Sequence, residues 1–71
     1  MLQYHFSIRD SGTELEELGF DGFDSDAGAI VFGKRVIEDL MRNDPEQYFG
    51  WIMDISQGIR AVASIPFSVS N

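Results

Sequence analysis

The side chains that could do chemistry are few, and the first to consider is the single histidine, His5. Histidine works as a general base when a carboxylate orients it inside a pocket. His5 instead falls on the polar side of an alternating stretch, which favours an exposed or dimer-facing strand histidine. The chain has no cysteine, no Gly-x-Ser-x-Gly motif and no glycine-rich phosphate loop. We therefore expect no catalytic residues and predict that the protein is not an enzyme.

The second candidate is a carboxylate-rich stretch, residues 21–26, with the sequence DGFDSD. An EF-hand calcium loop has oxygen ligands at alternating positions and a closing bidentate glutamate. Here the spacing is wrong, and Val31 and Phe32 stand where that glutamate would fall. We interpret these acids as helix-capping and solvating groups, so we expect no metal and no cofactor. A ligand- or ion-binding accessory domain that uses residues 10–26 is the alternative hypothesis.

The charge balance argues against nucleic acid as a partner. The chain has 12 acidic and 5 basic residues, giving a net charge of −7, whereas nucleic-acid binding draws its affinity from Lys and Arg. Tyr4, Phe6, Trp51 and Phe67 would suit a base-stacking platform, but a core needs the same rings. The acidic surface is typical of a soluble protein, and a basic protein partner is the sharper interpretation.

The length predicts one small α+β domain, residues 1–71. A chain this short buries only about 60% of its unfolded surface, and small domains commonly add disulfides, metals or a second subunit. Since cysteine is absent, we expect a homo-oligomer, most simply a dimer. No stretch approaches the roughly 20 apolar residues of a membrane span, and the first residues do not show a basic region followed by an apolar stretch. We therefore expect a cytoplasmic protein with no membrane partner.

Strands are expected wherever apolar and polar residues alternate. The alternation covers residues 2–9 and 59–69, as in half-buried strands. Because Pro66 has no N–H, the end of the last strand is expected either to be an edge of the sheet or to point its missing donor at solvent. Residues 48–55 predict a further strand that is apolar on both faces and therefore covered on both. A turn at residues 56–58 joins it to the last strand as a hairpin.

A helix is predicted between the two sheet-forming regions. Asp24 or Ser25 is its N-cap, Asp26 lies in its first turn, and Pro45 marks its end. Its apolar stripe contains Gly33, where a missing side chain indicates close approach of the helix to the sheet.

The stretch 13–23 keeps neither a helical nor a strand period. We predict a short strand there that pairs back on the first strand, followed by a loop through Gly19 and Gly22.

These elements predict an α+β fold in which an antiparallel-rich sheet of three to four strands has one helix packed on one face. The order is strand, short strand or loop, helix, strand, strand, or β-(β)-α-β-β. The predicted core consists of Tyr4, Phe6, Ile8, Ile30, Gly33, Ile37, Leu40, Trp51, Met53, Ala63, Ile65 and Phe67. The candidate interface residues are apolar side chains left over by this arrangement: Val31, Phe32, Tyr48, Ile52 and Val62.

The order of motifs resembles a family of very short bacterial proteins of unknown function. The chain opens with Y-x-F-x-I-R-D at residues 4–10, continues with D-x-x-A at residues 24–27, and closes with I-P-F at residues 65–67. It departs from the family pattern at residues 56–58, which lack an acidic residue beside the glycine, and at Gly28, where alanine is usual. The resemblance implies the fold and brings no catalytic residue, cofactor or substrate.

Two functions follow as hypotheses. The leading one is a non-enzymatic interaction module that self-associates, with a further protein partner still to be identified. It depends on the small core and on the expectation that residues 48–55 are apolar on both faces. The alternative is the ion- or ligand-binding accessory domain described above.

Overall fold

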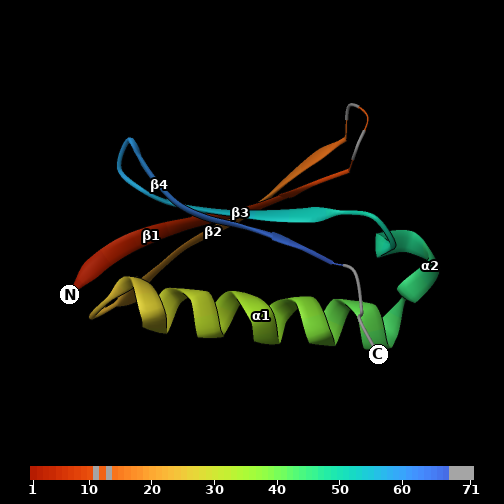
Figure 1. The fold of residues 1–71 in the computed structure, drawn as a ribbon, viewed down its shortest axis with the longest axis horizontal. Coiled ribbons are helices and arrows are strands. Elements are labelled where there is room, and N and C mark those ends of the chain that lie inside the picture. The colour runs from red at the N-terminus through yellow and green to blue at the C-terminus, as the bar shows by residue number, and fades with distance from the viewer. Residues whose placement is uncertain (11, 13, 68–71) are drawn as a thin grey trace.

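The computed structural model describes residues 1–10, 12 and 14–67. In chain order the elements are β1 (Leu2–Arg9), β2 (Leu15–Phe23), α1 (Asp26–Asn43), α2 (Pro45–Tyr48), β3 (Ile52–Gln57) and β4 (Arg60–Pro66). The strands form one antiparallel sheet in the order β2-β1-β3-β4, so β1 and β3 are central and β2 and β4 are edges. Helix α1 lies along one face of the sheet (Figure 1), which confirms the predicted α+β fold.

Two of the alternating stretches form strands where they were predicted. β1 has the expected bounds, and β4 lies within the expected stretch 59–69. Pro66 ends β4 at the edge of the sheet, opposite Ile52 of β3. An edge strand tolerates proline, because proline has no N–H to donate to a neighbouring strand. Residues 68 and 69 lie outside the described residues.

β2 is a continuous strand of nine residues, so the prediction of a short strand and a loop is wrong. A β-bulge explains the missing period. Phe6 pairs with Gly19 and Ser7 pairs with Glu17, which leaves Leu18 as the extra residue. Gly19 has a φ of +109°, a conformation that other residues rarely adopt. Because the bulge shifts the alternation by one residue halfway along β2, its two halves do not share one pattern.

The predicted strand 48–55 is wrong at its beginning. Pro45 occupies the first turn of α2, and the Asp44 carboxylate caps that helix by accepting a hydrogen bond from the Gln47 N–H at 3.3 Å. Tyr48 therefore belongs to a helix. Gly50, with a φ of +85°, turns the chain before β3 begins at Ile52.

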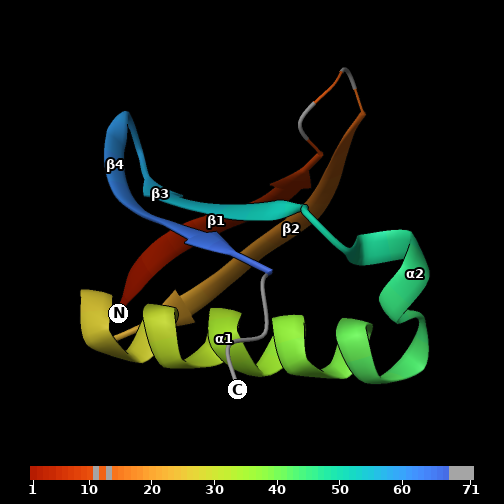
Figure 2. The ribbon, with the colours of Figure 1, turned by 45° about the vertical axis from the view of Figure 1, so that its right-hand side comes forward.

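The two faces of β3 also differ from the prediction. Met53 and Ile55 are buried on the face beneath α1. Since side chains alternate along a strand, Ile52, Asp54 and Ser56 point to the opposite face, where only Ile52 is apolar. The expectation of a strand that is apolar on both faces is therefore wrong. Figure 2 shows α1 on one side of the sheet and no described helix or strand on the other.

The ends and the packing of α1 follow its sequence. Ser25 is the N-cap, and its Oγ accepts a hydrogen bond from the Gly28 N–H at 3.3 Å. A Cβ atom on Gly33 would lie 2.9 Å from Cδ1 of Ile55 and 3.0 Å from Sδ of Met53. This confirms the predicted close approach of the helix to the sheet.

The core lies between α1 and the sheet. Its buried apolar residues are Tyr4, Phe6, Ile8, Ala29, Ile37, Trp51, Met53, Ile55 and Phe67. The sequence prediction missed Ala29 and Ile55. Four residues predicted as core are only half-buried at its rim: Ile30, Leu40, Ala63 and Ile65.

Candidate functional site

One edge of the sheet, β2, is available for further strand pairing. β2 has a neighbouring strand, β1, on one side only, so the backbone groups along its outer side have no strand partner among the described residues. Proteins commonly blunt such edges with proline or lysine. β2 contains neither, although it has a β-bulge at Leu18. The opposite edge, β4, carries Pro66 as well as a bulge at Val62.

Apolar side chains gather along this edge. Leu15, Leu18 and Phe20 are exposed by 62%, 40% and 72%. A single exposed apolar residue is ordinary, but several on one edge strand make that edge a candidate contact surface. The β-bulge contributes directly, because it inserts Leu18 beside Gly19 and so brings two consecutive residues of β2 to the space next to α1.

A pocket lies between the edge strand and the helix. Its volume is about 200 Å³, and it is lined by residues 18–21 of β2 together with Phe6, Phe32 and Val36. The ring of Phe32 packs 5.3 Å from the Phe6 ring and 5.2 Å from the Phe23 ring, centroid to centroid. Small-molecule sites usually measure about 300 to 1,000 Å³, so this pocket suits one apolar side chain better than a cofactor. We call β2 and this pocket together the β2 groove.

The candidate interface residues from the sequence lie at separate places. Phe32 lines the pocket, and Val31 beside it is 55% exposed. Tyr48 lies in α2, where its ring packs against Trp51 and Phe67 at 5.5 and 5.9 Å. Ile52 is on the open face of β3, and Val62 is in the edge strand β4, at the far side of the sheet from the β2 groove.

Sequence reasoning missed three residues of the groove: Leu18, Phe20 and Val36. Val36 belongs to the apolar stripe of the helix, one turn after Phe32, so its position next to Phe32 is visible in the spacing alone. Leu18 and Phe20 are concealed by the bulge, because a bulge can be placed only when both paired strands are known.

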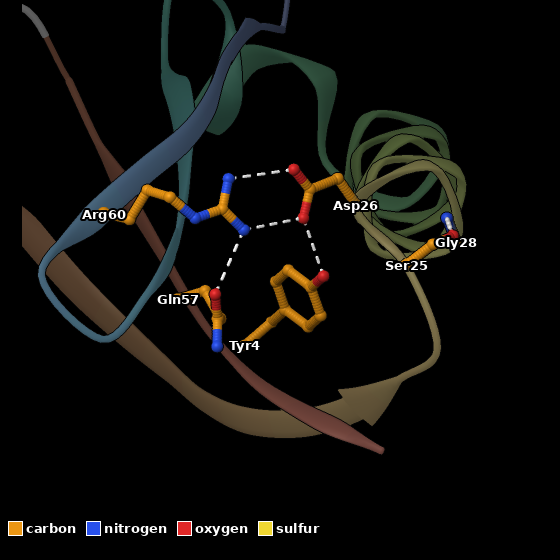
Figure 3. A network of polar contacts seen from close by, with 6 residues as sticks. All are labelled: Tyr4, Ser25, Asp26, Gly28, Gln57 and Arg60. Carbon is orange, nitrogen blue, oxygen red and sulfur yellow. Dashed lines mark hydrogen bonds and ion pairs between the residues drawn. The ribbon is translucent and has the colours of Figure 1, made fainter.

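A polar network ties the beginning of α1 to the β3–β4 hairpin (Figure 3). The Arg60 guanidinium donates to both carboxylate oxygens of Asp26, at 3.0 and 2.9 Å, and its Nη2 also donates to Oε1 of Gln57 at 3.0 Å. The hydroxyl of the buried Tyr4 donates to Oδ1 of Asp26 at 2.7 Å. Asp26 thus accepts bonds from two strands while it sits in the first turn of α1, where the helix dipole favours negative charge.

This network shifts the pKa values of its members. The hydrogen bonds from Arg60 and then Tyr4 lower the pKa of Asp26 from 3.8 to about 2. Burial, followed by the bond to Asp26, raises the pKa of the Tyr4 hydroxyl. Asp26 is therefore a carboxylate held in its charged form and Tyr4 a phenol held neutral. Both shifts move the groups away from acid–base work near neutral pH, and the hydrogen bonds of the network join the beginning of α1 to the sheet.

Acid should weaken the fold through Asp26. Because its pKa is depressed in the folded protein, its contribution to stability is present above pH 3.8 and is lost as the pH falls toward 2. We expect the urea midpoint of the wild type to fall across this interval. In Asp26→Asn, the midpoint should be lower above pH 3.8 and change less across the interval. An equally steep acid dependence in Asp26→Asn would contradict this role, and Asp39→Asn, on the exposed face of α1, is the control.

The open face of the sheet carries two ion pairs, together with the exposed Leu15 and Phe20 at its β2 edge. Nε2 of His5 contacts the Glu17 carboxylate, and the His5 ring lies 4.8 Å from the Phe20 ring. His5 thus has the orienting carboxylate that a general base requires, but it lies on an exposed strand face and no described hydroxyl is bonded to it. This pair was not anticipated from the sequence.

A second ion pair on this face joins two strands. Nε of Arg9 donates to Oδ2 of Asp54 at 2.6 Å, and Oγ of Ser64 donates to Oδ1 at 2.7 Å. Burial opposes the ionisation of Asp54, but the bonds from Arg9 and Ser64 outweigh it, so the pKa of Asp54 lies below its ordinary value. These contacts join β1, β3 and β4 through polar side chains that remain partly exposed to solvent.

The carboxylates of residues 10–26 have separate uses. Asp10 accepts bonds from the N–H groups of Gly12 and Glu14 at 2.9 and 3.1 Å, and Asp21 accepts one from the Gly22 N–H at 2.8 Å. Within the described part of the chain, no three His, Asp or Glu side chains converge as metal ligands. None of the described helices is long and apolar enough to cross a membrane.

The fold and the site together define a small antiparallel α+β domain with one open strand edge and an apolar pocket beside it. Comparisons of the chain with protein-family models, curated proteins and solved structures find no match. The resemblance to the family of short bacterial proteins therefore stays a prediction.

Proposed function

We propose that this protein is a non-enzymatic interaction module that binds an extended segment of another protein along the β2 groove. The observation that carries the proposal is the combination of a nine-residue edge strand, whose outer side has no strand partner among the described residues, with a pocket of about 200 Å³ directly beside it. In β-strand addition, main-chain hydrogen bonds to the edge supply affinity and a pocket for one side chain supplies specificity. The β2 groove offers both.

A second copy of the chain is the other candidate occupant. Its support is the small core of a 71-residue domain. The two ion pairs of the open face do not favour self-association there, so we expect a dimer to use β2. Light scattering coupled to size exclusion measures this directly.

The proposed function can be tested with a random peptide library displayed on phage. We expect the selected peptides to bind the wild type and to lose binding to Leu18→Ser, which alters the pocket wall. Phe49→Ser is the matched control, because Phe49 is 76% exposed and lies outside the groove. Peptides that bind Leu18→Ser as tightly as the wild type, or no enrichment at all, would contradict the proposal. Equal unfolding midpoints for the two variants establish that both are folded.

A further inference from the structure

We infer that the β2 groove is selective for a basic segment, in which Lys or Arg alternates with apolar residues. The segment adds to β2 as a fifth strand of the sheet and places one apolar side chain in the pocket. This inference depends on the proposed function and names the chemistry of the partner.

The charge of the edge strand is the first argument. Residues 14–24 contain five acidic residues and no lysine or arginine. All five, namely Glu14, Glu16, Glu17, Asp21 and Asp24, are exposed. Glu17 contacts His5 and Asp21 caps the Gly22 N–H, and no described Lys or Arg forms an ion pair with any of the five. A basic strand laid along β2 would meet this charge, while an acidic one would be repelled.

The helix side of the groove contributes little charge selectivity. Phe32 and Val36 present apolar surface to the pocket. Asp39 follows Val36 by three residues and so lies on the same side of α1, but its carboxylate is paired with Arg42 at 3.1 Å. Arg35 is a nearby cation at the border of that side. The charge that distinguishes a basic from an acidic partner therefore lies along β2, and α1 supplies the apolar wall of the pocket.

The pairing of β2 with β1 gives the pattern expected in the partner. Glu17 pairs with Ser7, and Phe20 pairs with His5, so both point to the open face of the sheet. The pocket lies toward α1, the other face. In an added strand, successive side chains therefore alternate between the pocket side and the side of Glu17. Lys or Arg suits Glu17 on the open side, which the exposed Leu15 and Phe20 share. On the pocket side an apolar residue suits the pocket, and the acidic Glu16 and Asp21, which pair with the buried Ile8 and Tyr4, lie on that same side.

Charge also separates this occupant from a second copy. If β2 paired with β2 of another molecule, two strands that each carry the same acidic residues would lie beside one another. Like charges on adjacent strands destabilise the pairing. A basic partner is attracted by the same acidic side chains that would repel a second copy.

The test uses three capped peptides of about eight residues, the length of an ordinary strand. Each alternates Val or Leu with one polar residue, which is Lys, Gln or Glu. Titration into the ¹⁵N-labelled protein should shift the amide signals of residues 15–23 with the Lys peptide. We expect the Glu peptide to bind at least about tenfold more weakly, and we expect added salt to weaken binding of the Lys peptide.

Two variants localise the effect. Glu16→Gln with Glu17→Gln should weaken binding of the Lys peptide about tenfold and leave the Gln peptide unchanged. Glu38→Gln is the matched control, since Glu38 is exposed on α1 and lies outside the groove; it should change neither.

Each result bears on a different statement. If the Gln or Glu peptide binds β2 as tightly as the Lys peptide, the inference of a basic partner is overturned and strand addition stands. If none of the peptides shifts the signals of residues 15–23, both the inference and the proposed function fail. A dimer that Leu18→Ser dissociates would identify a second copy as the occupant and would overturn the inference.

Discussion

Phe67→Ala is expected to lower the free energy of unfolding by about 3 to 5 kcal/mol, which is most of the stability of a domain this small. The Phe67 side chain is fully buried, and its ring packs 5.9 Å from that of Tyr48. Its N–H donates to the Trp51 carbonyl at 2.8 Å and so fastens the end of β4 to the beginning of β3. Removing the ring leaves a cavity in the place where α2 and the hairpin meet.

The chain supplies both the probe and the control for this measurement. Trp51 is the single tryptophan and is buried, so its fluorescence reports unfolding in urea. Phe49→Ala makes the same chemical change at a side chain that is 76% exposed, and it should alter stability by no more than about 0.5 kcal/mol. Similar losses for the two variants would show that the Phe67 ring does not hold the core.

Gly33→Leu is expected to destabilise the protein by about 3 kcal/mol. Even a Cβ atom at this position meets Ile55 Cδ1 at 2.9 Å and Met53 Sδ at 3.0 Å. Those atoms are the ends of flexible side chains, so they can yield to a single methyl group. They cannot yield to a whole leucine without moving α1 away from the sheet, because the core is closely packed.

Gly28→Ala replaces another glycine of the same helix with the smallest side chain and serves as the comparison. A Cβ atom there would lie 3.7 Å from the Phe23 side chain, which is an ordinary contact. Since alanine favours a helix over glycine by up to about 1 kcal/mol, this variant should be equal to the wild type or more stable. Urea unfolding of both variants gives the comparison. A stability for Gly33→Leu equal to that of Gly28→Ala would show that α1 does not approach the sheet closely at Gly33.

The parts of the fold that could be predicted are those with a local signature. β1 was predicted to the residue, because its alternation is unbroken. Ser25 and Asp26 marked the beginning of α1, since capping depends on neighbours in sequence. The error at Tyr48 has a local cause as well: Pro45 begins a short helix after it ends a long one, and the apolar run that follows masked this turn.

The parts that could not be predicted depend on contacts between distant residues. Nothing in the spacing of Asp26 and Arg60, which are 34 residues apart, indicates that they pair. The bulge at Leu18 becomes visible only from the register with β1, and the pocket beside it needs β2 and α1 to be placed together. Apart from Phe32, the candidate site was missed for this reason, although the acidic charge on which its proposed selectivity depends is plain in the sequence.

The strand order has a consequence for the way in which the chain reaches its fold. β1–β2 and β3–β4 are hairpins of neighbouring strands, and each can close over a short loop. The pairing between them, β1 against β3, joins residues that are distant in the sequence, such as Arg9 and Asp54, which are 45 positions from one another. Closing so long a loop costs entropy before any contact repays it. We therefore expect docking of the two hairpins to limit the folding rate. During synthesis, the central pair of strands, β1 and β3, can form only after β3 has left the ribosome.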